Sequence, residues 1–171
     1  AALRYSKNTD QAQMVKGVVL TTEEAKAIKV LRNILSKNQN DILSIGGTSD
    51  VFFNRIRFEL LFGLLGQHVD VFQPRKAYYN QWQKDLKHRD WQKVIEKISL
   101  YDEPFRSNSR INPKTKSVAV LMSVFSDPQV PDWTKRLLLQ NVLNVLQENG
   151  VLIVGWYKDQ KIKDREFRDT K

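Results

Sequence analysis

The chain has 171 residues, a formal net charge of +9, 41% hydrophobic residues and 27% charged residues, which is ordinary for one globular domain with a sizeable core. It contains no cysteine, so disulfides, thiolate chemistry and cysteine-based zinc sites are excluded. No apolar run approaches the roughly 20 residues of a membrane span. We therefore expect an intracellular protein, cytoplasmic or nuclear, with no membrane partner.

The first third of the chain predicts one amphipathic helix after a flexible N-terminus at residues 1–13. Thr21 and Glu24 have the spacing of a capping box. Apolar residues then recur at helical spacing, which predicts a helix over 22–37. The short apolar run at 14–20 is compatible with a strand or with the entry to this helix.

A second predicted helix, over 50–65, follows a turn at Gly46–Ser49. It is apolar on nearly every side, so we expect it at the centre of the core. A charged residue within it, such as Glu59, must then reach out at an end of the helix or be paired.

Further helices are expected from start signals and apolar spacing along the rest of the chain. Asn112 followed by Pro113 is a strong start signal, and Asn149–Gly150 is a stop signal. The segment 101–112 is expected to be a loop. The expected helices are 75–86 after Pro74, a helix from Asp90 to about 98, one over 113–125, and one over 131–149.

After Gly150 the residues become β-branched and aromatic, which predicts a hairpin over 151–163 that residues 14–20 could join. The fold class expected is thus mainly α, a compact bundle of about six helices with a small C-terminal β-hairpin. It would form a single helical domain over 14–163, followed by a polar tail at 164–171.

The positive charge is concentrated in one segment. Residues 75–116 hold 11 Lys and Arg against 5 Asp and Glu, which is +6 of the net +9. Basic residues interleaved with aromatic ones favour a polyanionic partner. Arg89, Lys93 and Lys97 recur every four residues, as on one face of a helix. The predicted nucleic-acid contacts are Arg75, Lys76, Tyr79 as a stacking platform, Lys84, Lys87, Arg89, Lys93, Arg106, Arg110, Lys114 and Lys116.

The sequence shows no catalytic motif, so we expect no enzyme, no catalytic residues, no metal site and no cofactor. His68 and His88 are the only histidines, and neither has a ligand partner at metal-binding spacing. Gly46–Gly47–Thr48 is only superficially similar to a phosphate loop, since no Lys precedes a Ser or Thr at the required position. We interpret it as a turn between helices.

The predicted function is therefore a non-enzymatic domain that binds DNA or RNA through phosphate contacts from a basic helical ridge. The main alternative is a helical interaction or scaffold module that docks an acidic protein. The segment from 131 onward is similar in layout to a winged helix, but its helix has few basic residues and would read DNA poorly. An enzyme acting on nucleic acid would need carboxylates that converge only in the fold.

Overall fold

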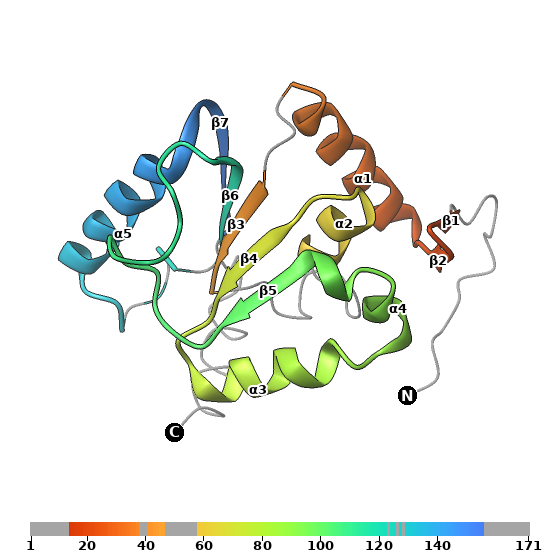
Figure 1. Ribbon diagram of the computed structural model, residues 1–171, viewed down its shortest axis with the longest axis horizontal. Helices are drawn as coiled ribbons and strands as arrows, with labels where there is room; N and C mark the ends of the chain where they lie inside the picture. The colour runs from red at the N-terminus through yellow and green to blue at the C-terminus, as the bar shows by residue number, and fades with distance from the viewer. Residues whose placement is uncertain are drawn as a thin grey trace.

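The computed structural model describes residues 14–37, 41–46, 58–122, 124–125, 127 and 129–155. Within these residues, five parallel strands form one sheet, and helices cover both of its faces (Figure 1). The strands of the sheet are β3 (Asp41–Ile45), β4 (Val69–Phe72), β5 (Ile98–Tyr101), β6 (Lys116–Met122) and β7 (Leu146–Gly155).

The order of strands across the sheet is β5-β4-β3-β6-β7, and each neighbouring pair is parallel. The chain steps outward from β3 to β4 and β5, then crosses back over β3 to begin β6 on its other side. Ile42 of β3 is in register with Val69 of β4 and with Val118 of β6. The order therefore reverses between β3 and β6, which is the defining feature of a doubly wound sheet.

The central strands form because both of their faces are covered. Four of the five residues of β3 and all four residues of β4 are buried. Strands of this kind read as continuous apolar runs and not as an alternation of apolar and polar residues. The run from Val118 to Leu121 in β6 is fully buried in the same way.

The helices lie where apolar stripes meet these faces. The capping box at the start of α1 is confirmed, since Thr21 N–H donates to Glu24 Oε2 (2.8 Å) and Glu24 N–H donates to Thr21 Oγ1 (3.2 Å). The helices are α1 (Thr22–Leu35), α2 (Phe58–Leu64), α3 (Lys76–Asp85), α4 (Arg89–Gln92) and α5 (Asp132–Val145), with a 3-10 turn at Ile95–Lys97. A separate hairpin pairs β1 (Met14–Val15) with β2 (Val18–Val19).

Two apolar cores lie on opposite faces of the sheet. On one face, α1 and α2 pack with Trp82 and Trp91, whose rings meet edge to face with centroids 5.4 Å apart. On the other face, α5 packs with Phe72 and Phe105. The burial of residues 59–64 agrees with the expected central position of the helix that contains them.

The predicted bundle of about six helices is wrong. Residues 41–45 and 98–101 are strands of a parallel sheet, and 116–122, expected within a helix over 113–125, form β6. Val118 and Leu121 have helical spacing by coincidence, because a buried strand is apolar at successive positions and therefore matches several periods. The loop expected over 101–112 starts one residue later, after Tyr101, and continues to the start of β6 at Lys116.

Two other expected elements end early. The helix expected from Asp90 to about 98 stops at Gln92, and the helix expected over 131–149 stops at Val145, where the chain enters β7 directly. The described part of the expected hairpin, 151–155, pairs in parallel with β6 and not with 14–20. Residues 156–163 of that hairpin, the expected flexible N-terminus at 1–13 and the tail at 164–171 lie outside the described residues. No helix among the described residues is long and apolar enough to cross a membrane.

Candidate active site

The reversal of strand order marks the place where a sheet of this kind binds ligands. Chain segments leave β3 and β6 in opposite directions, so a crevice opens outside the carboxyl ends of these strands. We call this side of the sheet, where strands end, the carboxyl edge, and the opposite side the amino edge. Gly46 follows β3 at the carboxyl edge, Gln73 follows β4, and Asp127 lies beyond β6.

Gly46 turns the chain away from the sheet with a left-handed backbone, φ 81°. A residue with a Cβ is strained there, which explains the glycine. The Gly46 N–H donates to the Phe72 carbonyl oxygen (2.8 Å), and its own carbonyl accepts from the Gln73 carboxamide. Gln73 is 4% exposed, and its Oε1 accepts from the Arg75 backbone N–H (3.0 Å). The Gln73 side chain therefore fixes the position of the first residue after β3.

An ion pair joins the loops after β4 and β6. Arg75 donates through Nη2 to Oδ2 of Asp127, which is buried, and the other carboxylate oxygen of Asp127 accepts from the Gln129 N–H (2.8 Å). The charges of Arg75 and Asp127 compensate one another. We refer to Gly46, Gln73, Arg75 and Asp127 as the switch-point cluster, because they tie together three strand ends around the reversal.

A buried polar contact lies just behind this cluster. Ser44 of β3 donates through Oγ to Oε1 of Glu59 (2.6 Å), and both side chains are fully buried. Of the two alternatives expected for Glu59, reaching out at a helix end or being paired, the structure shows the second. The contact ties α2 to the carboxyl-terminal half of β3.

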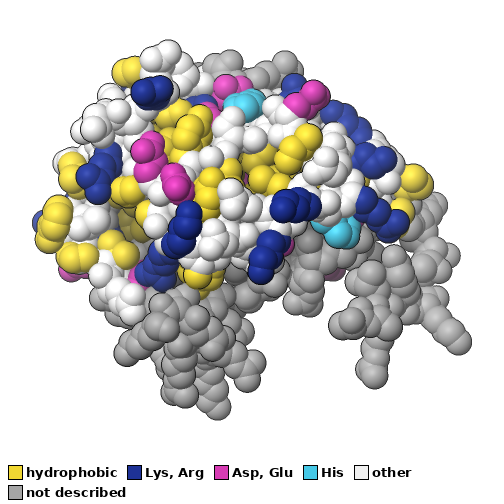
Figure 2. Space-filling view, turned by 60° about the horizontal axis from the view of Figure 1, so that its bottom comes forward, with side chains coloured by type: hydrophobic (Ala, Val, Ile, Leu, Met, Phe, Trp, Pro, Cys, Tyr) yellow, Lys and Arg dark blue, Asp and Glu magenta, His cyan; other side chains and the backbone are white. Residues whose placement is uncertain are grey.

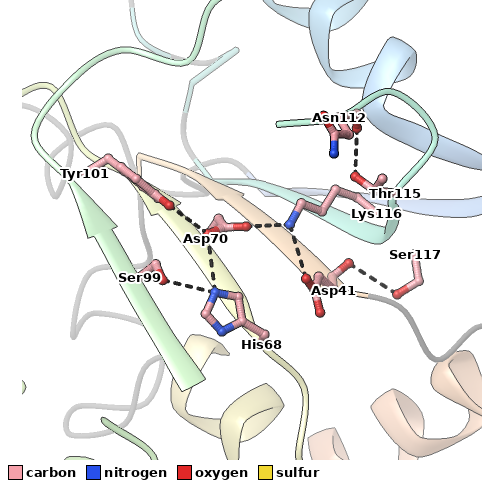
Figure 3. A network of polar contacts seen from close by, with 9 residues as sticks. All are labelled: Asp41, His68, Asp70, Ser99, Tyr101, Asn112, Thr115, Lys116 and Ser117. Atoms are coloured by element: carbon pink, nitrogen blue, oxygen red, sulfur yellow. Dashed lines mark hydrogen bonds and ion pairs between the residues drawn. The ribbon is translucent and has the colours of Figure 1, made fainter. Parts of the chain in front are cut away.

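A second polar network lies at the amino edge (Figure 3). The ammonium group of Lys116, the first residue of β6, contacts the carboxylate of Asp70 and lies 3.8 Å from that of Asp41. Lys116 is only 3% exposed. His68 Nε2 lies 3.4 Å from Asp70 Oδ1 and 3.0 Å from Ser99 Oγ. One side chain from each of β3, β4, β5 and β6 thus takes part.

The combination of Ser99, His68 and Asp70 is not a nucleophilic triad. In a triad the hydroxyl and the carboxylate use opposite nitrogens of the imidazole, so that the base is oriented from behind. Here both contacts fall on Nε2. No three His, Asp or Glu side chains in the described part of the chain are placed to hold a metal ion. The network therefore joins strands of the sheet, and its Ser99, His68 and Asp70 side chains lack the geometry of a triad.

Tyr101 completes this network. Its hydroxyl donates to Asp70 Oδ1 (3.2 Å). Burial of the phenol raises its pKa above the usual 10.0, and the nearby negative charge of Asp70 raises the pKa further. Tyr101 therefore remains a neutral donor toward Asp70 at physiological pH.

The residues predicted to contact nucleic acid do not form one ridge. Arg89, Lys93 and Lys97 do not share a helical face, because α4 ends at Gln92 and a 3-10 turn follows. Figure 2 shows Lys and Arg side chains at several separate places on one face of the protein. Lys84, Lys87, Arg89 and Lys93 are exposed on α3, α4 and their connections, whereas Arg106, Arg110 and Lys114 are exposed in the loop between β5 and β6.

Five of the predicted contacts have partners within the protein: Arg89 lies 3.8 Å from Asp90, and four others have the contacts that follow. Arg75 pairs with Asp127, and Lys116 with Asp70. The Lys76 ammonium group lies 5.0 Å from the centroid of the Tyr79 ring, and the Tyr79 hydroxyl accepts from Gln83 (3.2 Å). A phosphate could reach Lys116 only after its buried ion pair had opened. The structure brings Arg106 and Arg110 together at one depression in the surface.

Solved structures with a similar fold include methyltransferases. The chain superposes on a glycopeptide N-methyltransferase, MtfA, complexed with S-adenosyl-L-methionine, with a TM-score of 0.54 and 15% identity over 77% of this chain. It also superposes on a SAM-dependent O-methyltransferase from Thermotoga maritima, with a TM-score of 0.50 and 10% identity, over 91% of this chain and 55% of that one. The fold is the one found in these enzymes.

The likeness extends to part of each neighbour, since the chain spans about half (48%) of the length of MtfA in that complex. A methyltransferase from Geobacter sulfurreducens superposes with a TM-score of 0.50 and 12% identity, and 63% of its length is covered. No protein-family model matches the sequence, and no curated protein matches it.

These matches overturn the expectation of a non-enzymatic nucleic-acid-binding domain, and also the alternative of a helical scaffold module. Both rested on a helical bundle with a basic ridge. The observed α/β fold is that of enzymes that transfer methyl groups. The expectation of no enzyme is contradicted by this fold likeness. It was based on motifs within single segments, whereas this fold brings residues from several strand ends together.

Sequence reasoning missed Gln73 and Asp127, and Gly46 was assigned to a turn between helices. The signal that could have identified Gly46 is its place directly after a short apolar run, Ile42 to Ile45, with an apolar helix following. Gln73 likewise follows an apolar run directly. Asp127 has no such signal, since its partner Arg75 is 52 residues away.

Lys116→Met tests whether the amino-edge network is structural. Removing one partner of a buried ion pair should lower the free energy of unfolding by about 3–5 kcal/mol, because Asp70 is left buried without its main counter-charge. Lys116→Met combined with Asp70→Leu should restore much of this loss. Urea unfolding of the full chain measures both values. If the single variant loses under about 1 kcal/mol, comparable to an exposed pair, Lys116 does not fix the strands.

Proposed function

We propose that this chain binds S-adenosylmethionine across the carboxyl ends of β3 and β4 and transfers its methyl group to an acceptor molecule. The observation that carries the proposal is the reversal of strand order beside β3, with Gly46 at its end. The methyltransferase structures of the same fold support it, although a fold by itself hosts many functions.

The residues at this edge fit such a cofactor. S-adenosylmethionine presents ribose hydroxyls, a sulfonium and an ammonium group. Its site therefore needs a backbone that the ligand can approach closely and hydrogen-bond acceptors that carry negative charge. Gly46 has no Cβ and lies at the strand end. Asp102, the first residue after β5, is exposed, and among the described residues it is in no ion pair. Its carboxylate can accept from hydroxyl or ammonium groups.

When bound, S-adenosylmethionine supplies an electrophilic methyl carbon on a sulfonium. The chain's own residues bind and orient. Gly46 allows the backbone to approach the ligand, and Gln73 holds the Gly46 carbonyl in place. The pair of Arg75 and Asp127 fastens the segment beyond β6 to the start of α3. Because these two charges compensate, the exposed carboxylate of Asp102 adds a negative charge at the end of β5, and its sign favours the cationic sulfonium and ammonium groups.

Gly46→Ala, compared with Gly66→Ala, tests the location. Both glycines have a left-handed backbone, with φ of 81° and 88°, and a Cβ at Gly66 would meet nothing within 4 Å. Both changes should cost about 1–2 kcal/mol of stability. Gly66 lies at the amino edge, so only Gly46→Ala should weaken binding of S-adenosylhomocysteine, by about tenfold. Isothermal titration calorimetry of the folded full-length variants measures this.

Equal affinities of the two alanine variants would place the ligand elsewhere. If the unsubstituted chain binds neither S-adenosylmethionine nor S-adenosylhomocysteine, the proposed function is wrong.

Gln73→Glu distinguishes a positioning role for Gln73 from direct binding. The change removes the N–H that donates to Gly46 and sets a carboxylate against that carbonyl oxygen. The affinity for S-adenosylhomocysteine should fall by about tenfold, since an unpaired buried acceptor costs about 1–3 kcal/mol. Gln83→Glu, which makes the same charge change on the exposed surface of α3, should have no effect. If Gln73→Glu binds as tightly as the unsubstituted chain or more tightly, Gln73 contacts the ligand itself.

A further inference from the structure

A surface depression lies in the loop that joins β5 to β6. Its volume is about 390 Å³, and its lining combines two guanidinium groups with an amide, a hydroxyl and one carboxylate. The residues that line it are Glu103, Pro104, Arg106, Asn108, Ser109 and Arg110. We call it the arginine pocket.

The backbone of this pocket is held in place at both ends. Phe105 is 6% exposed and meets Phe72 edge to face, with centroids 5.2 Å apart. On the far side, Ile111 packs against the core beneath α5. The Lys114 N–H donates to the carbonyl oxygen of Asn144 in α5 (3.1 Å). The loop is therefore anchored on the sheet and on α5, and the pocket lies between these anchors.

Hydrogen bonds within the loop fix the spacing of the two arginines. The Arg106 N–H donates to Ser109 Oγ (2.9 Å), and the Ser109 N–H donates to the Arg106 carbonyl oxygen (3.1 Å). The Ile111 N–H donates to the Ser109 carbonyl oxygen (2.7 Å). Because Ser109 Oγ accepts inside the loop, its hydroxyl proton remains able to donate outward.

The charges of the pocket favour an oxyanion. In the part of the chain that the structure describes, neither Arg106 nor Arg110 is in an ion pair. Glu103 is the one acidic residue in the lining, so positive charge is in excess. Guanidinium groups bind carboxylate and phosphate oxygens through paired N–H donors, and such charge-assisted bonds are among the strongest in proteins.

The pocket adjoins the switch-point cluster. The Gln73 backbone N–H donates to the carbonyl oxygen of Tyr101 (2.9 Å), the last residue of β5, and Glu103 follows two residues later. Phe105 contacts Phe72, which immediately precedes Gln73. A molecule held in the arginine pocket would therefore lie beyond the end of β5, one strand from Gln73 and two strands from Gly46.

We infer that the arginine pocket binds an oxyanion group, a carboxylate or a phosphate, of the molecule that accepts the methyl group. This inference rests on the proposed function, because it identifies the molecule in the pocket as the methyl acceptor, held beside the bound cofactor. The chemistry common to both kinds of acceptor is a planar or tetrahedral set of anionic oxygens between Arg106 and Arg110. The acceptor expected is an anionic small molecule.

Titration of the full chain with inorganic phosphate, and separately with acetate, tests this inference. Backbone amide chemical shifts should change at residues 103–111, in the presence and in the absence of S-adenosylhomocysteine. Arg106→Gln combined with Arg110→Gln should weaken phosphate binding by about tenfold or more, since two charged partners are lost. Lys84→Gln with Lys87→Gln removes the same charge from exposed positions and should leave binding unchanged.

The two probes distinguish the two kinds of acceptor. If phosphate binds about tenfold more tightly than acetate, the acceptor is phosphorylated, because two guanidinium groups match the larger charge of phosphate. If phosphate and acetate bind equally tightly, the acceptor carries a carboxylate. The inference would be overturned if phosphate changed amide chemical shifts over the whole surface and not at residues 103–111. It would also be overturned if the Arg and Lys double variants bound phosphate with equal affinity. Glu103→Gln gives a second test, since loss of a negative charge in the lining should tighten phosphate binding.

Binding of S-adenosylhomocysteine to the same variants separates this inference from the proposed function. If the Arg double variant binds S-adenosylhomocysteine normally but not phosphate, both proposals hold. If the unsubstituted chain binds phosphate at residues 103–111 but never binds S-adenosylhomocysteine, the oxyanion site holds and the methyl-transfer function fails.

Discussion

Strand β3 is hydrogen-bonded to β4 on one side and to β6 on the other, and four of its five residues are buried. The chain leaves β3 toward β4 and, after β5, crosses back to β6 on the other side of β3, so the connections that follow β3 and β6 diverge from neighbouring strand ends. The arrangement of residues at the carboxyl edge depends on the central position of β3. Because β3 has a strand on each side, the loops that follow two other strands lie beside its end. One of them, the loop after β4, supplies Gln73, and the other, the loop after β6, supplies Asp127.

The two edges of the sheet use charge differently. At the amino edge, Lys116 and Asp70 are buried against one another, and His68 and Tyr101 both contact the other carboxylate oxygen of Asp70, Oδ1. A network of this kind is satisfied internally and leaves no charge for a ligand. At the carboxyl edge, the pair of Arg75 and Asp127 is compensated, while Asp102 and the arginine pocket lie open beside it. The uncompensated charge thus lies on the side where the strand order predicts a ligand.

Some local signals of the sequence were correct and others were not, since no helix follows Asn112–Pro113 and Asn149–Gly150 lies within β7. The capping box of Thr21 and Glu24 predicts the start of α1 correctly, because both of its hydrogen bonds lie within one turn. Pro131 likewise marks the start of α5. The strands were missed for a physical reason. A strand buried on both faces, such as Val118–Leu121, has no alternation, and its apolar residues match a helical period equally well.

The candidate site could be predicted only in part. Arg106 and Arg110 were selected for their charge, but Lys116 was selected for the same reason and is buried in an ion pair. Charge counted along a sequence cannot distinguish these cases, since Asp70 lies 46 residues from Lys116. Gly46 carried a signal in its place after an apolar run. Because the strand before Gly46 was not predicted, however, that signal indicated only a turn.

A crystal structure of the full chain with saturating S-adenosylhomocysteine tests the central claim most directly, namely that the reversal beside β3 forms the ligand site. We expect the ligand outside the carboxyl ends of β3 and β4, against the backbone of Gly46, with Asp102 within hydrogen-bond distance of its hydroxyl or ammonium groups. A ligand bound at the amino edge near Lys116, or crystals in which saturating ligand leaves the carboxyl edge empty, would contradict the claim.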